Sequence, residues 1–101
     1  MKTSYLRNMR VFKFGGASVK DAEGVRNVVS ILGQFTGEKL VVIVSAMGKT
    51  TNALEKLNQA HLDQLPETFD IFSEIKQAHL NIIKDLFPDS KHPVYDEIEN
   101  T

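Results

Sequence analysis

The sequence has no cysteine among its 101 residues, which excludes disulfide bonds, thiolate metal sites and a cysteine nucleophile. That absence fits a reducing compartment, so we expect the protein in the cytoplasm. Long apolar runs are also missing, because the stretch from Lys39 to Ala46 is too short to cross a bilayer. Residues 1–10 are not followed by an apolar core of signal-peptide length. We therefore expect neither export nor a membrane partner.

No charge of one sign predominates, since 12 Lys and Arg residues face 13 Asp and Glu residues for a net charge of −1. A chain of this kind has no electrostatic footprint for nucleic acid or an anionic membrane, so neither partner is expected. The three histidines, His61, His79 and His92, lack ligand-like spacing, which argues against a metal site built from them. The length suffices for one small domain or part of one.

The most informative segment that is present is Val11–Val19, which reads VFKFGGASV. It predicts a short strand over Met9–Phe14, then a turn at Gly15 and Gly16 that leads into a helix. Glycines let backbone N–H groups converge, and a helix start adds unpaired donors, so this pattern favours a phosphate site with Lys13 as its positive charge. The alternative is that the glycine pair is only a tight turn.

A second strand follows the first after an amphipathic helix. The spacing predicts a helix over Asp21–Phe35, with Gly33 and Gly37 as stop signals. Its apolar face is expected to contain Val25, Val28, Val29, Leu32 and Phe35. The β-branched run Leu40–Val44 is typical of a strand that is buried on both faces in a parallel sheet. Together these elements form one βαβ unit, whose two strand ends line one crevice.

The loop after the second strand, Ser45–Asn52, carries hydroxyl and amide side chains at a helix start. Gly48-Lys49-Thr50 is similar to the end of a P-loop, but Ile43 stands where that motif needs a glycine, so we set the motif aside. Capping would use one or two of these polar side chains. The others would remain able to hydrogen-bond a small polar substrate.

Two further helices are expected towards the C-terminal end. The first extends to about His61, and the second spans Glu67–Phe87 after Pro66. The second carries an apolar stripe of Phe69, Phe72, Ile75, His79, Ile82, Ile83 and Leu86. Residues 94–101 form either the start of another helix or a frayed end.

The two motifs together resemble the N-terminal signature pair of the aspartate kinases. These motifs are Lys13–Val19 and Val42–Asn52, and the resemblance is strong over residues 10–60. It implies an α/β fold, namely the N-terminal βαβ-containing part of the three-layer α/β/α sandwich of the amino acid kinases. It also implies transfer of the ATP γ-phosphoryl group to the β-carboxylate of L-aspartate, giving 4-phospho-L-aspartate, in the biosynthesis of lysine and related amino acids.

The resemblance further implies site residues, position by position. Lys13 matches the lysine that contacts the transferring phosphoryl group, which makes it the catalytic candidate. Phosphate or ATP binding falls to Lys13, Gly15, Gly16 and Ser18, and substrate binding to Ser45, Thr50, Thr51 and Asn52. Mg²⁺ is expected in the full enzyme. One departure is Ala17, where the family commonly has threonine.

Residues 1–101 are therefore expected to be a partial amino acid kinase domain, with further nucleotide-binding segments and ACT regulatory domains outside this sequence. We expect the isolated chain to be inactive. A sibling kinase for glutamate or a carbamate fits less well, because its loops would not combine these two motifs. A different alternative is a small stand-alone α/β phosphate-binding or interaction module without catalysis. A homo-oligomer is expected, with the stripe from Phe69 to Leu86 as the shared surface.

Overall fold

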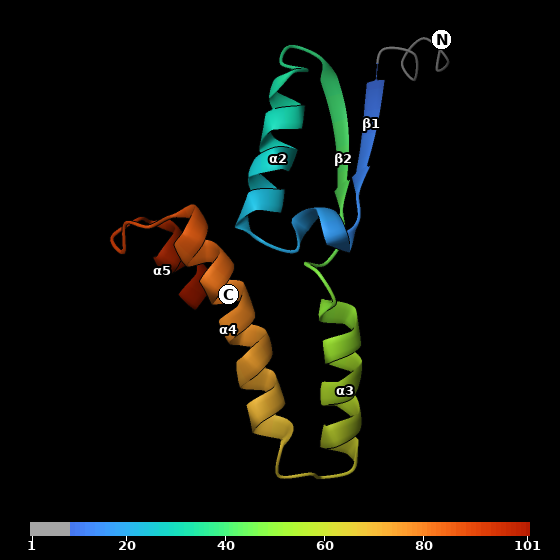
Figure 1. The fold of residues 1–101 in the computed structure, drawn as a ribbon, viewed down its shortest axis with the longest axis vertical. Coiled ribbons are helices and arrows are strands. Elements are labelled where there is room, and N and C mark those ends of the chain that lie inside the picture. Colours follow the sequence, from blue (N-terminus) through green and yellow to red (C-terminus); the bar gives the residue numbers. More distant parts are fainter. Residues whose placement is uncertain (1–8) are drawn as a thin grey trace.

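The computed structural model describes residues 9–101 and has the mixed α/β character expected from the sequence (Figure 1). Its elements are β1 (Met9–Phe14), the 3-10 helix η1 (Gly16–Val19), α2 (Ala22–Gly33), β2 (Lys39–Val44), α3 (Thr50–Leu62), α4 (Thr68–Leu86) and α5 (Val94–Glu99). Residues 9–49 form the α/β unit, and residues 50–86 form the helical hairpin, which extends away from it (Figure 1).

The strands β1 and β2 pair in parallel, as predicted. Their register runs from Met9 opposite Lys39 to Phe14 opposite Val44. Helix α2 is the crossover between them, and it lies beside the sheet (Figure 1). The C-terminal ends of both strands therefore lie at the same edge of the sheet, which is where open α/β sheets bind their ligands.

Helix α2 is shorter than the sequence predicted. It begins after Asp21, whose carboxylate accepts a hydrogen bond of 2.8 Å from the Gly24 N–H. This bond satisfies one of the donors that a helix start leaves unpaired. The helix ends at Gly33, and Gln34 and Phe35 bond back to carbonyls three residues earlier, so a tighter turn replaces the last predicted turn.

The core lies between α2 and the sheet. Its buried residues are Phe14, Val19 and Val28, and the partly buried Phe12, Val25, Ile31, Leu32 and Met47 pack against them. The predicted apolar face of α2 is thus confirmed, with one error. Val29 is 64% exposed, because it lies about 100° around the helix from the buried Val28.

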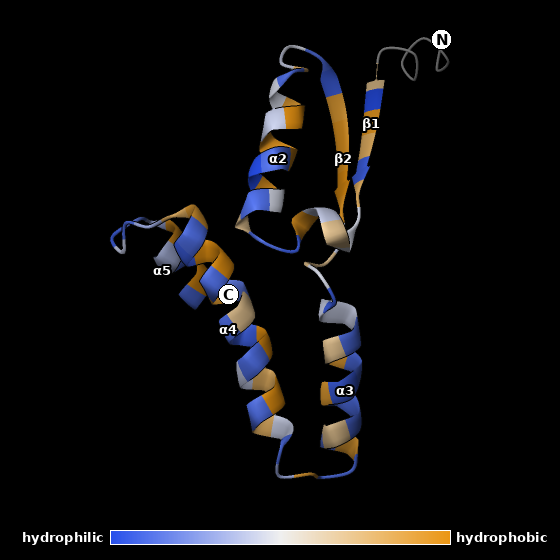
Figure 2. Cartoon of the chain, viewed as in Figure 1, coloured by the Kyte–Doolittle hydropathy of each residue, from blue (hydrophilic) through white to orange (hydrophobic). Residues whose placement is uncertain are grey.

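The prediction that β2 is buried on both faces is wrong for the part of the chain that the structure describes. Ile43 is 50% exposed and Val44 is 54% exposed. Apart from Lys39 at its start, β2 is hydrophobic along its length, as Figure 2 shows. A two-stranded sheet covered on one side by one helix is too small to bury such a strand, so its apolar residues remain in contact with solvent.

Helices α3 and α4 pack against each other, and the small side chain of Ala60 is buried between them, at 3% exposure. The chain reverses through a turn in which the Leu65 N–H bonds to the Ala60 carbonyl at 2.9 Å. Helix α4 begins at Thr68 and ends at Leu86, one residue inside the predicted range at each end. The stripe divides: Ile75 and the members beyond it are half-buried, while Phe69 and Phe72 are exposed.

The C-terminal end of α4 is joined to both its neighbours. The Arg26 guanidinium of α2 donates to the Asp85 carbonyl at 2.5 Å, and the Tyr95 hydroxyl of α5 donates to the Phe87 carbonyl at 2.5 Å. Both bonds satisfy carbonyls at the end of a helix, where a positive charge is also favourable. For residues 94–101 the sequence allowed either another helix or a frayed end. The helix is confirmed, because Val94–Glu99 forms α5.

Candidate functional site

The two sequence motifs meet at the C-terminal edge of the sheet. The Ser45 N–H donates to the Phe14 carbonyl at 2.9 Å, which extends the pairing of the strands by one residue. Beyond it, the Gly48 N–H donates to the Gly16 carbonyl at 3.0 Å. Two backbone hydrogen bonds therefore hold the loop after β1 against the loop after β2.

Gly16 permits this close approach of the two loops. A Cβ atom at this position would lie 2.5 Å from the Gly48 carbonyl oxygen and 3.1 Å from the Ala46 carbonyl oxygen. Both neighbours are backbone atoms, which cannot rotate away as a side chain can. Gly48 itself has a φ of +56°, a conformation that favours glycine. Replacing either glycine would therefore disturb the junction of the loops.

Gly15 is different, because nothing lies within 4 Å of the position where its Cβ would be. Its backbone is extended, with φ −78° and ψ 174°, a conformation open to any residue. Neither conformation nor packing among residues 9–101 accounts for a glycine here. A requirement for open space next to the backbone would account for it, and a bound phosphate imposes that requirement.

The helix start in this phosphate pattern differs from the expectation. The glycine pair leads into η1, a single short turn, and α2 begins only at Ala22. The Asp21 carboxylate already occupies the start of α2. Helix α2 therefore offers fewer unpaired donors than expected, and Lys13 is the full positive charge at the end of β1 that leads into this loop.

Several predicted site residues have side chains that make no internal hydrogen bond or ion pair within residues 9–101. These residues are Lys13, Ser18, Ser45, Thr51 and Asn52, and all of them are exposed. By strand alternation Lys13 lies on the face opposite that of Phe12 and Phe14, which pack under α2. The polar groups of these five predicted site residues are therefore available to a ligand.

Thr50 is the exception among the predicted substrate residues. Its hydroxyl donates to the Met47 carbonyl at 2.5 Å, and its side chain is half-buried. The expectation that capping would use one or two of these polar side chains is wrong, because none of them makes a capping bond at the start of α3. Thr50 bonds back to the loop, while the N-cap residue, Lys49, makes no side-chain capping bond.

A cleft of about 900 Å³ lies between α3 and α4 and is bordered by the loop after β2. It is lined by Lys20, Met47, Gly48, Lys49, Thr50, Asn52, Ala53, Glu55, Lys56, Gln59, Ile71, Glu74, Ile75, Ala78, His79 and Ile82. Thr50 and Asn52 line it, whereas Lys13, Ser45 and Thr51 do not. The predicted residues thus divide between the cleft and the outer side of the loops.

Sequence reasoning did not find Lys20, which lines the cleft beside Gly48. The Cβ of Lys20 would lie 3.7 Å from a Cβ on Gly48. Lys49, which follows this glycine in the sequence, also lines the cleft. Lys20 and Gly48 are close because η1 folds back against the second loop. No spacing of residues in the sequence predicts this contact. Two lysines therefore stand beside a loop with a predicted affinity for anions.

The described residues, 9–101, contain no group of three or more His, Cys, Asp or Glu side chains that could hold a metal ion. Within the same range no helix combines the length and the apolar character needed to cross a membrane.

Comparison with known proteins assigns the chain to a family. Residues 8–94 match the model of the amino acid kinase family. The match covers most of the chain and includes both motif loops, so the chain belongs to the amino acid kinase family. No solved structure was found to match it.

Within that family the chain is aspartokinase-like. It is 38% identical over 79 residues to Aspartokinase 2, chloroplastic, of Arabidopsis thaliana, covering 75% of this chain and 14% of that protein. It is 45% identical over 56 residues to Aspartokinase 2 of Bacillus subtilis, covering 54% of this chain and 14% of that one. Aspartokinase of Mycobacterium tuberculosis is 47% identical over 51 residues, or 48% of this chain and 12% of that protein. The chain thus spans about a seventh of the relatives' length.

Proposed function

We propose that residues 1–101 supply part of the phosphoryl-transfer site of an aspartokinase, which transfers the ATP γ-phosphoryl group to the β-carboxylate of L-aspartate. The observation that carries this proposal is the junction of the two motif loops, with the Gly48 N–H bonded to the Gly16 carbonyl. It brings a lysine-bearing strand end and a hydroxyl-rich helix start together at the edge where α/β sheets bind ligands. The similarity to aspartokinases supports the choice of aspartate as acceptor.

The proposed chemistry needs positioning more than a protein nucleophile. A carboxylate oxygen of aspartate attacks the γ-phosphorus, the bond from that phosphorus to the bridging oxygen breaks, and ADP leaves with the bridging oxygen. The Lys13 ammonium would stabilise the negative charge on the transferring group. Gly15, Gly16 and Ser18 would face the ATP phosphates with backbone and hydroxyl groups.

The acceptor side of the site is proposed to lie on the second loop. Ser45, Thr51 and Asn52 would hydrogen-bond aspartate, since their polar groups make no internal bond within the described residues. Thr50 would act differently, because its hydroxyl is bonded to Met47 and holds the loop in shape. We therefore expect Thr50 to position this loop.

Mg²⁺ remains a proposal for the whole enzyme. The carboxylates and histidines of residues 9–101 do not gather into a metal-binding group, so the chain does not fit the ion by itself. No step above depends on it. A location in the cytoplasm and a role in lysine biosynthesis are likewise proposals for the whole protein.

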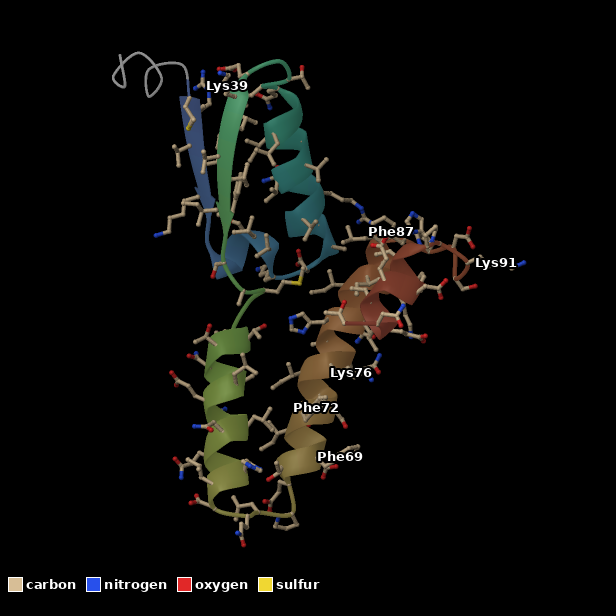
Figure 3. The ribbon with its side chains drawn as sticks, turned by 180° about the vertical axis from the view of Figure 1, so that it is seen from behind. Lys39, Phe69, Phe72, Lys76, Phe87 and Lys91 are labelled. Carbon is tan, nitrogen blue, oxygen red and sulfur yellow. The ribbon has the colours of Figure 1, made fainter. Side chains whose placement is uncertain are left out.

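The test is replacement of Lys13 by alanine in a polypeptide that carries these residues together with the rest of an aspartokinase catalytic domain. Loss of one charge aimed at the transition state should lower kcat about 10²- to 10³-fold, with a smaller change in the KM for aspartate. Lys91→Ala is the matched control, because Lys91 lies far from the motif loops (Figure 3). Unchanged turnover in Lys13→Ala would remove Lys13 from the mechanism.

The 101-residue chain alone should form no aspartyl phosphate in a hydroxamate assay. A stand-alone module would also form no aspartyl phosphate, but it differs in the expected effects of Lys13→Ala. In that case Lys13→Ala would weaken phosphate binding by the short chain, and the longer polypeptide would show no dependence of turnover on Lys13. Aspartyl phosphate formed by the short chain would contradict the proposal that it is inactive alone.

A further inference from the structure

His79 lies on α4 and lines the cleft between α3 and α4. Its Nδ1 atom is 2.8 Å from the Ile75 carbonyl oxygen, one turn earlier in the helix. A carbonyl oxygen only accepts hydrogen bonds, so Nδ1 carries a proton, and Nε2 of the neutral ring carries a lone pair. Protonation of the ring turns Nε2 into a donor.

The Nε2 atom of His79 makes no hydrogen bond within residues 9–101. The side chain is half-buried, yet no buried side-chain nitrogen or oxygen of the described residues lacks a partner. Nε2 is therefore not sealed inside the protein. Since the residue lines the cleft, this nitrogen is open to a ligand there.

Two ammonium groups lie at the end of the cleft that borders the loop after β2. Lys20 follows η1, Lys49 is the N-cap residue of α3, and both side chains are exposed. Neither makes an ion pair within the described residues. A Cβ on Gly48 would lie 3.7 Å from that of Lys20, so both lysines are next to this glycine.

His79 borders the same end of the cleft from α4. The two helices are antiparallel and diverge from the turn towards the motif loops (Figure 1). His79 and Lys49 are separated from the turn by a similar length of helix, so they lie at the same level of the hairpin. Three basic side chains, from three different elements, therefore border one end of the cleft.

The carboxylates of the cleft lie closer to the turn. Glu74 precedes His79 by about 7 Å along the axis of α4, and Glu55 follows Lys49 by about 9 Å along α3. Lys56, next to Glu55, offsets one of these two negative charges. The excess of positive charge therefore lies at the loop end of the cleft.

Much of the remaining wall is apolar, and the cleft is far larger than an inorganic anion needs. Its volume of about 900 Å³ is in the range of sites for small organic molecules. Such sites combine an apolar wall with a few polar groups that fix the orientation of the ligand. The apolar side chains here are Met47, Ala53, Ile71, Ile75, Ala78 and Ile82.

We propose that this cleft binds a small organic phosphate monoester, with its phosphate group between Lys20, Lys49 and His79 and its organic part along the apolar wall. The phosphate of a monoester has three terminal oxygens, which accept hydrogen bonds from donors on different sides. Two lysines and a protonated histidine supply such donors, and their charge strengthens the bonds.

This site is separate from the proposed phosphoryl-transfer site. Lys13, Ser45 and Thr51 do not line the cleft. Thr50 and Asn52 do line it, so a ligand in the cleft contacts the loop after β2 from another side. The cleft would therefore hold its ligand while the transfer site holds ATP.

Sulfate binding by the 101-residue chain tests the role of His79. Sulfate keeps its two charges between about pH 8 and about pH 5.5, whereas an imidazole ordinarily gains a proton across this range. A protonated ring adds a positive charge and a donor, so the affinity should rise about five- to tenfold towards the lower pH. NMR titration measures it.

His79→Gln should abolish the rise in sulfate affinity at low pH. His61→Gln is the matched control, because His61 also lies on the hairpin but does not line this cleft. An affinity that does not depend on pH, or a pH dependence that survives His79→Gln, overturns the proposal. Ring nitrogen shifts that place the proton of neutral His79 on Nε2 would contradict it as well.

Lys20→Ala is a second variant, at an exposed position where folding should not be affected. It should weaken sulfate binding about fivefold at every pH and leave the rise at low pH in place. Lys91→Ala, far from the cleft (Figure 3), should change nothing. Binding lost in Lys13→Ala but not in Lys20→Ala would place the anion at the predicted phosphate loop. That result overturns this proposal and favours the proposed function.

The organic part of the ligand needs a separate measurement. Phenyl phosphate and inorganic phosphate are compared at about pH 8, where both are mainly dianions. Phenyl phosphate should bind about tenfold more tightly, because its ring covers part of the apolar wall. Equal affinities for the two anions would overturn the assignment of an organic phosphate.

Discussion

The α/β unit and the helical hairpin are held together in different ways. In the α/β unit, Phe14, Val19 and Val28 form a buried cluster, and backbone hydrogen bonds fix the two loops at its edge. In the hairpin, Ala60 is buried, and α4 has no buried residue at all. The motif loops of the α/β unit are therefore held by close backbone contacts. The hairpin is held mainly by apolar side chains that remain partly exposed.

Gly16→Ala in the α/β unit should cause the largest loss of stability among the changes considered for the two parts. The added methyl group would lie 2.5 Å from the Gly48 carbonyl oxygen, so the loops must move apart. We expect a loss of about 2 kcal/mol in the free energy of unfolding, typical of overpacking, measured by urea unfolding. Gly33→Ala is the control, since nothing lies within 4 Å of that site, and its stability should not fall. Equal effects of the two changes would show that the junction is not tightly packed.

The connection between the two parts should be sensitive to Arg26. Replacement by alanine removes the bond of 2.5 Å to the Asp85 carbonyl, which links α2 to the end of α4. We expect a loss of about 1 kcal/mol, because the bond is charge-assisted but exposed. Amide exchange should rise at the end of α4 and remain unchanged in β1 and β2. Lys91→Ala, a nearby charge change, should leave exchange as it is.

Much of the fold can be predicted from the sequence, because the spacing of apolar residues along a short segment indicates whether it is a helix or a strand. That information places β1, α2, β2, α3 and α4 to within about two residues, and it places both motif loops at one sheet edge. It does not find the approach of Gly16 to Gly48, the position of Lys20 or the bond from Arg26. Those contacts join residues that are distant in sequence, and their geometry depends on how whole elements pack. The burial of β2 was overestimated for the same reason, since a strand's pattern does not say how many layers cover it.

The start of α2 gives a smaller test within the α/β unit. Asp21→Ala removes the capping bond to the Gly24 N–H, and we expect a loss of about 1 kcal/mol in a thermal unfolding experiment. Asp21→Ser should recover most of that loss, because a serine hydroxyl can accept the same bond. A failure of serine to recover it would indicate that the negative charge matters more than the bond.

The smallest effect is expected at the ion pair between Arg10 and Glu38, whose closest atoms are 3.1 Å apart. Both side chains are about half exposed, so Glu38→Gln should cost no more than about 0.5 kcal/mol. The difference from the unaltered chain should shrink further in high salt, because exposed charges are screened. A larger, salt-independent loss would mean that this end of the strands contributes more than its exposure indicates.

The hydrogen bond from the Gly48 N–H to the Gly16 carbonyl also has a consequence for the order of folding. Its two ends are separated by η1, the whole crossover helix and β2, so it can form only after the chain has reversed direction twice. The entropy of closing so long a loop is recovered only when the strands pair. The junction of the motif loops should therefore be among the last local structures to form as the chain folds, and among the first to open when the strands separate.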